Sequence, residues 1–217
     1  MENFILVKPS ILSMKKIPFV NKFIAKEYGI PDYHDSIALI TSNSKHSLFV
    51  SLDKATKDSD VTVIFKTGLY GGFRYASGPI SGEVLAVISG ENPIVVDNGL
   101  KATTDYMEEK AFFYSHGNSF TFFAHVIGSI GRLLSEASDL EEGESLAYLF
   151  APPLEATIAL DYALKNSDTS LVKFFKPPTN INFSGAYLSG SLSECEAAKD
   201  AFIDSIKDII KNPIDQI

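Results

Sequence analysis

Two stretches of the chain share one pattern of hydrophobic and polar positions. Residues 36–65 and residues 145–175 each run from an apolar segment, through apolar positions at helical spacing, into a second apolar segment. Four polar residues recur 108 positions later: Asp53, Lys57, Ser59 and Asp60 match Asp161, Lys165, Ser167 and Asp168. Because solenoid repeats are only about 20–50 residues long, a repeat this long indicates two tandem domains of one fold.

The first copy predicts a strand, a helix and a strand. The continuous apolar run at residues 37–41 predicts a buried strand, and the β-branched run at residues 61–65 predicts a second one. Between them, Leu48 and Leu52 recur at helical spacing and predict a helix over residues 46–57. This compact crossover unit is typical of α/β (α+β) domains.

The segments around this unit complete the first domain. Apolar residues 4–7 predict a short strand, and residues 17–28 have the spacing of a helix that ends at Gly29. A strand is predicted at residues 84–88, and Asn92 is expected to cap the helix that follows. The inward-facing side chains of that helix are predicted to be Val96, Leu100, Thr103 and Met107.

The second half has the same order of elements. Strands are predicted at residues 112–114, 146–150, 171–175 and 186–188. One helix is predicted over residues 126–137, a second between the strands at 146–150 and 171–175, and a third after a capping box formed by Ser193 and Glu196. We therefore expect one domain at residues 1–108 and another at residues 109–217.

One loop in each half stands out by its composition. Residues 66–83 hold five glycines and a proline, which excludes a helix or a central strand, together with Tyr70, Phe73 and Arg74. The matching loop at residues 176–185 is shorter. Long loops in compact domains are usually functional or disordered, so the first loop is a candidate for function.

The composition excludes several classes of function. A net charge of -8 argues against binding to nucleic acid, which requires clustered Lys and Arg. A single cysteine, Cys195, fits a reducing compartment. We find no signal-peptide pattern and no apolar run of the roughly 20 residues that cross a bilayer, so we expect a cytoplasmic protein without a membrane partner.

The search for catalytic chemistry predicts no enzyme and no metal site. The four histidines are scattered, and none has the spacing of a zinc-binding helix. Two glutamates are more informative. Glu155 follows two prolines at a helix start, where the helix dipole alone would favour a carboxylate. Glu83 follows the glycine-rich loop without such a reason, and is the stronger ligand candidate.

Several segments resemble a known family, the EutL-type shell proteins of the ethanolamine-utilisation bacterial microcompartment. They are ASGPISGEV, SLAYLFAPPLEAT, FFAHV and the terminal KNPI. The resemblance extends over essentially the whole chain. It implies two tandem, circularly permuted BMC domains with ferredoxin-like βαβ cores. It also implies a pseudohexameric trimer that tiles with other shell proteins into a facet.

The resemblance also implies sites. The two loops would gate a pore at the three-fold axis, lined by Tyr70, Gly71, Gly72, Phe73, Arg74, Asn180 and Asn182. Smaller openings would bind ethanolamine through Glu83 and Glu155, with Phe112 on the apolar wall. Lys45 stands where the family leads us to expect an acidic residue, and it would weaken the attraction of a cation if it faces the opening.

The expected function is therefore a structural shell protein, a homotrimer that transports substrate or cofactor through a gated pore. No cofactor is required. Because the enclosed lyase of such compartments uses cobalamin, the resemblance allows a cobalamin contact at a pore. Two alternatives stay open: a small-molecule-sensing regulatory trimer that uses residues 66–83 as a lid, and an enzyme whose site forms between subunits.

Overall fold

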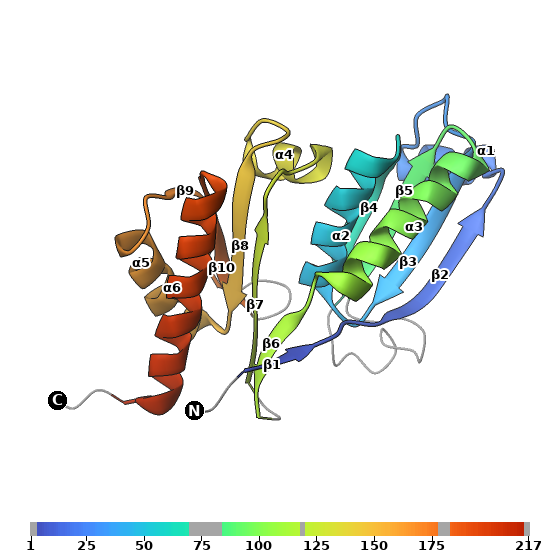
Figure 1. The fold of residues 1–217 in the computed structure, drawn as a ribbon. Helices are drawn as coiled ribbons and strands as arrows, with labels where there is room; N and C mark the ends of the chain where they lie inside the picture. Colours follow the sequence, from blue (N-terminus) through green and yellow to red (C-terminus); the bar gives the residue numbers. More distant parts are fainter. Residues whose placement is uncertain (1–3, 70–83, 118–119, 178–182, 215–217) are drawn as a thin grey trace. The chain divides into compact units, whose positions relative to one another are not determined.

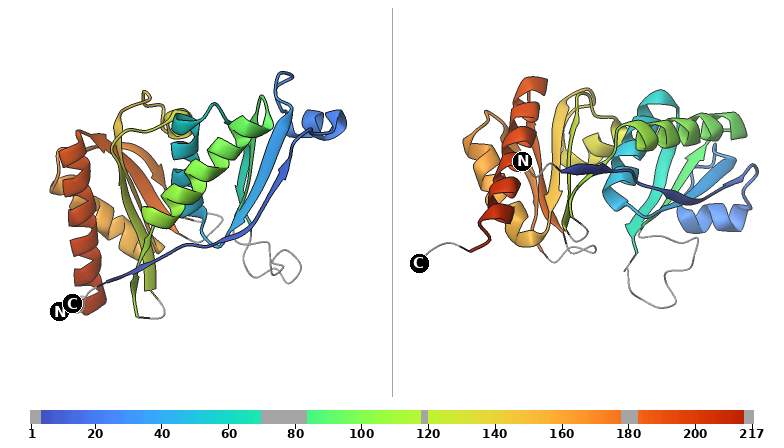
Figure 2. Two further views of the ribbon diagram at one scale, coloured as in Figure 1. Left: turned by 45° about the vertical axis from the view of Figure 1, so that its right-hand side comes forward. Right: turned by 60° about the horizontal axis from the view of Figure 1, so that its bottom comes forward.

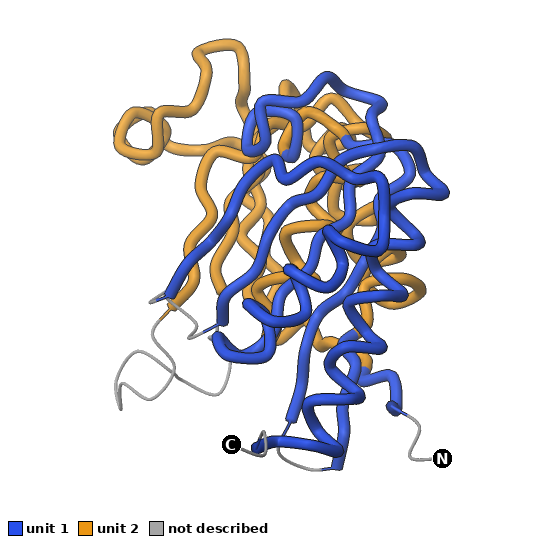
Figure 3. The backbone as a smooth tube through the Cα atoms, turned by 90° about the vertical axis from the view of Figure 1, so that its left-hand side faces the viewer, with its two compact units in different colours: residues 1–7, 113–130, 134–217 blue, residues 8–112, 131–133 orange. Residues whose placement is uncertain are grey.

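The computed structural model describes residues 4–69, 84–117, 120–177 and 183–214 (Figure 1). Its contacts divide the chain into two compact units, coloured separately in Figure 3. Unit 1 contains residues 1–7, 113–130 and 134–217, and unit 2 contains residues 8–112 and 131–133. The expected division at residues 1–108 and 109–217 stays a prediction about the permuted domains.

Unit 2 is built on a four-stranded antiparallel sheet. Its strand order is β2 (Ile11–Ile17), β3 (Ser36–Ser42), β5 (Val84–Gly90) and β4 (Thr62–Gly68). Helices α2 (Lys45–Asp58) and α3 (Pro93–Glu109) pack together over one face (Figures 1 and 2). The core between sheet and helices includes Ala38, Ile40, Leu48, Leu52, Ala86, Ile88, Val96 and Met107.

The other face of this sheet is covered in part by the short helix α1 (Lys22–Tyr28). Side chains alternate between the two faces of a strand, so Ile37 points away from α2, whereas Ala38 points toward it. Ile37 and Val87 form a small buried cluster with Ile30, against which Ala25 and Tyr28 of α1 pack. Unit 2 is therefore a sheet between two layers.

Unit 1 repeats the plan with more strands. Its six-stranded antiparallel sheet has the order β1 (Ile5–Val7), β6 (Phe113–His116), β7 (Phe120–Ile127), β8 (Ser145–Ala151), β10 (Ser184–Gly190) and β9 (Ser170–Phe175). Helices α5 (Pro153–Lys165) and α6 (Leu192–Lys211) cover one face (Figure 2). The remaining helix, α4 (Arg132–Ser138), belongs to unit 1 from Leu134 onward.

Aromatic rings fill the opposite face of the central strands of unit 1. Tyr148 lies opposite Tyr187 on the neighbouring strand, with ring centroids 4.9 Å apart. Phe150 and Phe175 continue the cluster, at 5.2 Å from each other. Burial raises the pKa of the Tyr148 phenol well above its ordinary value, and the neighbouring phenol of Tyr187 raises it further.

The long helix α3 confirms the prediction made for it. The Asn92 side chain accepts hydrogen bonds from the backbone N–H groups of Ile94 and Val95. The predicted inward positions Val96, Leu100, Thr103 and Met107 are all buried. The predicted end of α1 is also confirmed, because Gly29 adopts φ 65°, in the left-handed region.

Two helices begin later in the structure than the sequence predicted. Residues 11–17 form β2, which the apolar pattern did not reveal, and the chain then bends before Asn21 caps α1. In the second half, Val126 and Ile127 complete β7, and α4 begins only at Arg132. In both cases the apolar residues at the end of a strand and at the start of the next helix have the spacing of a single helix. The pattern therefore predicted one longer helix.

Two further expectations are corrected. The capping box of α6 is formed by Ser191 and Glu194 rather than Ser193 and Glu196, because β10 ends at Gly190 and Ser191 is the first side chain able to cap the helix. The apolar run at residues 4–7 forms a strand as predicted, but β1 pairs with β6 of unit 1. Within the described residues, no helix combines the length and apolarity needed to span a bilayer.

Candidate functional site

In unit 2, the loop with the unusual composition leaves the sheet beside the start of α2. Gly68 at the end of β4 and Ser42 at the end of β3 both pair with Val84, the first residue of β5. Ser44 caps α2 by accepting a hydrogen bond from the backbone N–H of Ser47. The first turn of α2, with Lys45, therefore lies at the same end of the sheet as the loop that follows β4.

Unit 1 has the same arrangement. Ser184 at the start of β10 pairs with Ala151 at the end of β8, and the next residue, Gly185, pairs with Phe175 at the end of β9. Helix α5 begins two residues after Ala151. The sequence repeat thus places a helix start and a loop exit together in each unit.

Glu155 occupies the first turn of α5 and is half-buried. The N-cap residue, Pro152, provides no side-chain hydrogen bond to the exposed N–H groups of this turn. A carboxylate at a helix start interacts favourably with the helix dipole. The position accommodates the negative charge that a cationic ligand would require, and the dipole stabilises that charge when no ligand is bound.

The corresponding end of unit 2 is positively charged instead. The Lys45 ammonium lies 5.4 Å from the centroid of the Phe49 ring, and the Lys66 ammonium lies 6.0 Å from the same centroid. Both distances allow a cation–π interaction. Burial lowers the pKa of Lys45. Next to it, His46 is fully buried, and its pKa is lowered well below the ordinary value by burial and then by the Lys45 charge.

Phe112 lies where the chain passes from unit 2 to unit 1. It follows α3 and the buried Ala111, and its backbone N–H donates to the Lys110 carbonyl at 3.0 Å. Its side chain is half-buried. Phe112 belongs to unit 2 and Glu155 to unit 1.

The other predicted site residues lie outside the described part of the chain. They are Tyr70, Gly71, Gly72, Phe73, Arg74, Glu83, Asn180 and Asn182. Their roles in pore lining and ligand binding stay predictions. The structure describes the strand ends that these loops join, Gly68 and Val84 in unit 2 and Phe175 and Ser184 in unit 1.

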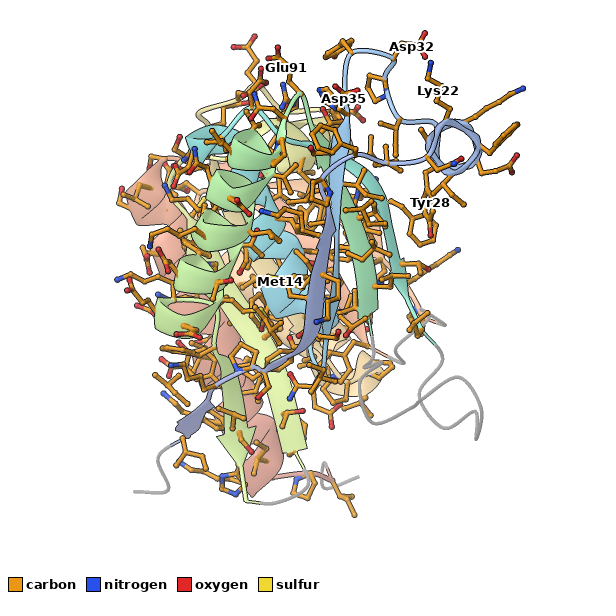
Figure 4. The ribbon with its side chains drawn as sticks, turned by 90° about the vertical axis from the view of Figure 1, so that its right-hand side faces the viewer. Met14, Lys22, Tyr28, Asp32, Asp35 and Glu91 are labelled. Carbon is orange, nitrogen blue, oxygen red and sulfur yellow. The ribbon has the colours of Figure 1, made fainter. Side chains whose placement is uncertain are left out.

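Sequence reasoning missed a hollow of about 790 Å³ beside α1 in unit 2. Lys22 and Lys26 of α1 line it, as do Asp32 and Asp35 of the loop that follows; Figure 4 labels Lys22, Asp32 and Asp35. His34, also in its lining, is buried with Nδ1 2.7 Å from the Ser89 hydroxyl oxygen, and burial lowers its pKa. The hollow was not predicted because the sequence indicated one helix over residues 17–28, without the bend that precedes α1.

The described residues offer little for catalysis. Cys195 is fully buried, and burial raises the pKa of its thiol, which disfavours the thiolate nucleophile. Across the described ranges, no three His, Cys, Asp or Glu side chains come together as metal ligands.

Comparison with known proteins identifies relatives along nearly the whole chain. No protein-family model matches. The chain is 40% identical over 211 residues to the bacterial microcompartment shell protein EutL of Clostridium perfringens, covering 96% of this chain and 97% of that protein. It is 38% identical to the protein of the same name from Salmonella typhimurium, with 96% of each chain covered.

Solved structures agree with these relatives. The crystal structure of the ethanolamine utilization protein EutL from Leptotrichia buccalis matches with a TM-score of 0.94 and 41% identity, covering 100% of both chains. A trimeric bacterial microcompartment shell protein, PduB, matches with a TM-score of 0.78 at 12% identity, covering 93% of this chain and 89% of that one, which shows the fold alone. The predicted fold class and resemblance are therefore confirmed, and the chain belongs to the EutL family of bacterial microcompartment shell proteins.

Proposed function

We propose that the chain is a structural shell protein of the ethanolamine-utilisation microcompartment and not an enzyme. The observation that carries this proposal is the 40% identity to a EutL shell protein along 96% of the chain. Membership of a shell-protein family implies oligomeric assembly with other shell proteins and a location in the compartment shell. Imaging a fluorescent fusion in cells that form these compartments tests the location, which would be contradicted by diffuse fluorescence.

The finer proposal is a homotrimeric tile with a gated central pore. Two domains of one fold can imitate a six-fold ring with three chains, and the loops after β4 and β9 leave corresponding strand ends. The first loop is longer, so gating would depend mainly on residues 66–83. Native mass spectrometry of the purified chain is expected to give three copies. A monomer at every concentration would contradict the tile.

Gating itself requires a separate measurement. We expect two arrangements of residues 66–83, one closing and one opening the pore. Crystal structures or single-particle images of the trimer should show both. A variant in which Gly71 and Gly72 are replaced by alanine is expected to favour one arrangement, because alanine restricts the backbone. An identical loop path under all conditions would contradict gating.

Ethanolamine is the proposed ligand of the smaller openings, with Glu83 and Glu155 facing its ammonium group and Phe112 on the wall. At intermediate effective dielectric an ammonium 4 Å from a carboxylate gains about 4 kcal/mol, from which desolvation and solvent screening must be subtracted. Binding should therefore be weak. The positive charges at Lys45 and Lys66 would weaken it further if they face the ligand.

Isothermal titration with ethanolamine tests this assignment. Glu155→Gln is expected to weaken binding about tenfold, or about 1.4 kcal/mol, and Lys45→Gln is expected to strengthen it. Glu108→Gln, at an exposed position of α3, is the matched control and should change nothing. Equal affinity in all three variants would contradict the site.

We also propose that cobalamin contacts a pore of the trimer, although the protein requires no cofactor. The proposal rests on the family resemblance. Equilibrium dialysis of the trimer against cobalamin should show binding that ethanolamine at saturating concentration does not remove, if the central pore is the site. Retention no greater than that of an unrelated protein of the same size would contradict it.

A further inference from the structure

Two lysines of unit 2 converge on one aromatic ring. Phe49 lies in the second turn of α2, and its side chain is partly buried against the core of this unit. The Lys45 ammonium lies 5.4 Å from the ring centroid, and the Lys66 ammonium lies 6.0 Å from it. Lys45 belongs to the first turn of the same helix, whereas Lys66 belongs to strand β4. We call these three residues the two-lysine cluster.

Helix spacing and strand register bring the cluster together. Lys45 and Phe49 are four residues apart on α2, so their side chains lie on the same face of the helix. Lys66 pairs with Ala86 in the antiparallel register, and paired residues point to the same side of a sheet. Ala86 belongs to the core beneath α2, so Lys66 projects from the face of the sheet that carries this helix. Both ammonium groups therefore lie at one end of α2.

The Phe49 ring prepares the two charges for a ligand. The face of an aromatic ring attracts an ammonium group by about 0.5–1 kcal/mol at exposed sites. A lysine held there has already lost part of the rotamer freedom of its long side chain, so a bound anion would remove less entropy. Lys45 is half-buried, and burial lowers its pKa because the ammonium group has lost part of its hydration. An anion at this position would replace that hydration.

The cluster is a feature of one copy of the repeat. Its three positions correspond, 108 residues later, to uncharged residues: Pro153, Thr157 and Phe174. The correspondence holds in the structure, because Lys66 pairs with Ala86 just as Phe174 pairs with Ala186. At these positions, the duplicated fold therefore has a pair of ammonium groups in unit 2 and none in unit 1.

We propose that the two-lysine cluster binds a phosphate group, either as inorganic phosphate or as the head group of a phosphate monoester. Two ammonium groups match the charge of about −1.5 to −2 that a phosphate group carries at pH 7, and lysine binds phosphate as a point charge. The start of α2 adds the positive end of a helix dipole, which also favours an anion. The inference goes beyond the proposed function, because the cluster lies within one unit of one chain and requires neither ethanolamine nor a pore.

Isothermal titration of the purified protein with inorganic phosphate at low ionic strength tests the cluster. We expect a dissociation constant on the order of 1 mM, and weaker binding in added sodium chloride, because Lys66 is exposed and its charge is screened. Lys45→Gln and Lys66→Gln should each weaken binding about tenfold, and Lys45→Arg should retain it. Lys54→Gln is the matched control, since it removes a positive charge from the same helix outside the cluster.

Phe49→Leu isolates the contribution of the ring. The variant keeps both lysines and an apolar side chain against the core, but it removes the surface that holds the ammonium groups. Phosphate binding is expected to weaken about threefold. Circular dichroism and thermal unfolding show whether each variant is folded, and the two lysine variants test the cluster whether or not Phe49→Leu folds.

Ethanolamine provides an internal comparison. Removing the charge of Lys45 should weaken phosphate binding and strengthen ethanolamine binding. A general loss of structure would weaken the binding of both ligands, so opposite changes in the same variant identify an effect of charge. Weaker binding of both ligands by a folded Lys45→Gln variant would contradict the assignment of Lys45 to an anion site.

Two further probes define the class of ligand. Glycerol 3-phosphate that binds at least as tightly as inorganic phosphate would identify a monoester head group, and tighter binding of inorganic phosphate would identify the free ion. Acetate carries a single charge and should bind about tenfold more weakly than phosphate. Equal affinity for acetate and phosphate would overturn the phosphate assignment.

The outcomes separate this inference from the proposed function. Absence of phosphate binding, or equal binding by the unmodified protein and both lysine variants, overturns the cluster and leaves the shell tile and the ethanolamine site intact. Phosphate binding that depends on both lysines, in a protein that is a monomer by native mass, supports the cluster and contradicts the tile.

Discussion

The Asp53 carboxylate accepts a hydrogen bond from the backbone N–H of Gly131, 2.7 Å away and 78 positions later in the chain. Asp53 is buried, although Asp residues are rarely buried without a partner. Its repeat counterpart, Asp161, is exposed and forms an ion pair with Lys165 at 2.6 Å. One residue type at one repeat position therefore serves two different purposes in the described structure.

This difference predicts unequal effects of the same substitution. Asp53→Asn replaces a buried charge-assisted hydrogen bond by a weaker one and should lower the free energy of unfolding by about 1.5–3 kcal/mol. Asp161→Asn is the matched control, because an exposed i,i+4 pair contributes only about 0.3–0.5 kcal/mol. Urea denaturation of both variants measures the difference. Equal losses would contradict the structural role of Asp53.

A larger residue in place of Gly131 is predicted to destabilise the protein. In Gly131→Ala the new Cβ would meet the Asp53 carbonyl oxygen and Lys57 Cγ at 2.6 Å, so the backbone must move. We expect a loss of about 1–3 kcal/mol, as for other overpacked sites. Gly128→Ala is the control, since its nearest neighbour, Leu192 Cδ1, lies at 3.4 Å. Thermal unfolding should distinguish the two, and a stable Gly131→Ala would show that the segment Gly131–Leu133 is loosely held.

His46 is predicted to make the protein sensitive to acid. Its pKa in the folded state is well below 6.5, because burial and the Lys45 charge disfavour the imidazolium. Below pH 6.5 the unfolded chain therefore binds a proton that the native state does not, and stability falls as pH falls, by up to about 1.4 kcal/mol per pH unit.

The repeat offers the matched variant for this test, because Leu154 occupies the position that corresponds to His46. His46→Leu should flatten the fall in stability between pH 6.5 and pH 5, whatever its effect at pH 8. Urea denaturation across this pH range measures both. An unchanged slope would show that His46 does not control the acid limit.

Two tyrosines are predicted to limit stability in alkali. Burial, followed by the Asp53 charge, raises the pKa of Tyr106 to about 12, and burial also raises that of Tyr148. Above pH 10 the native state keeps phenol protons that the unfolded chain releases, so stability falls as pH rises through this range. Tyr106→Phe and Tyr148→Phe should each reduce that fall, and absorbance titration of the folded protein should lose a late-titrating phenol in each variant.

Local features of the chain predicted the elements that depend on neighbours in sequence. Asn92 and Pro93 marked the start of α3, and the spacing of Val96, Leu100 and Met107 identified its buried face. A helix cap and a buried stripe are made within about four residues of each other, so the residues that form them also reveal them. The β2 strand was missed because its half-exposed edge position leaves no clear alternation.

The duplication, the order of most strands and helices, and the family of the chain could all be inferred from the amino-acid sequence. Three features could be read only from the folded chain: β1 pairs with β6, Asp53 is buried against Gly131 while Asp161 is exposed, and Phe23 of α1 is exposed. Strand pairing and burial could not be inferred because they depend on residues far apart in the chain. Identical side chains in the two copies therefore acquire different partners once the fold brings different segments to them.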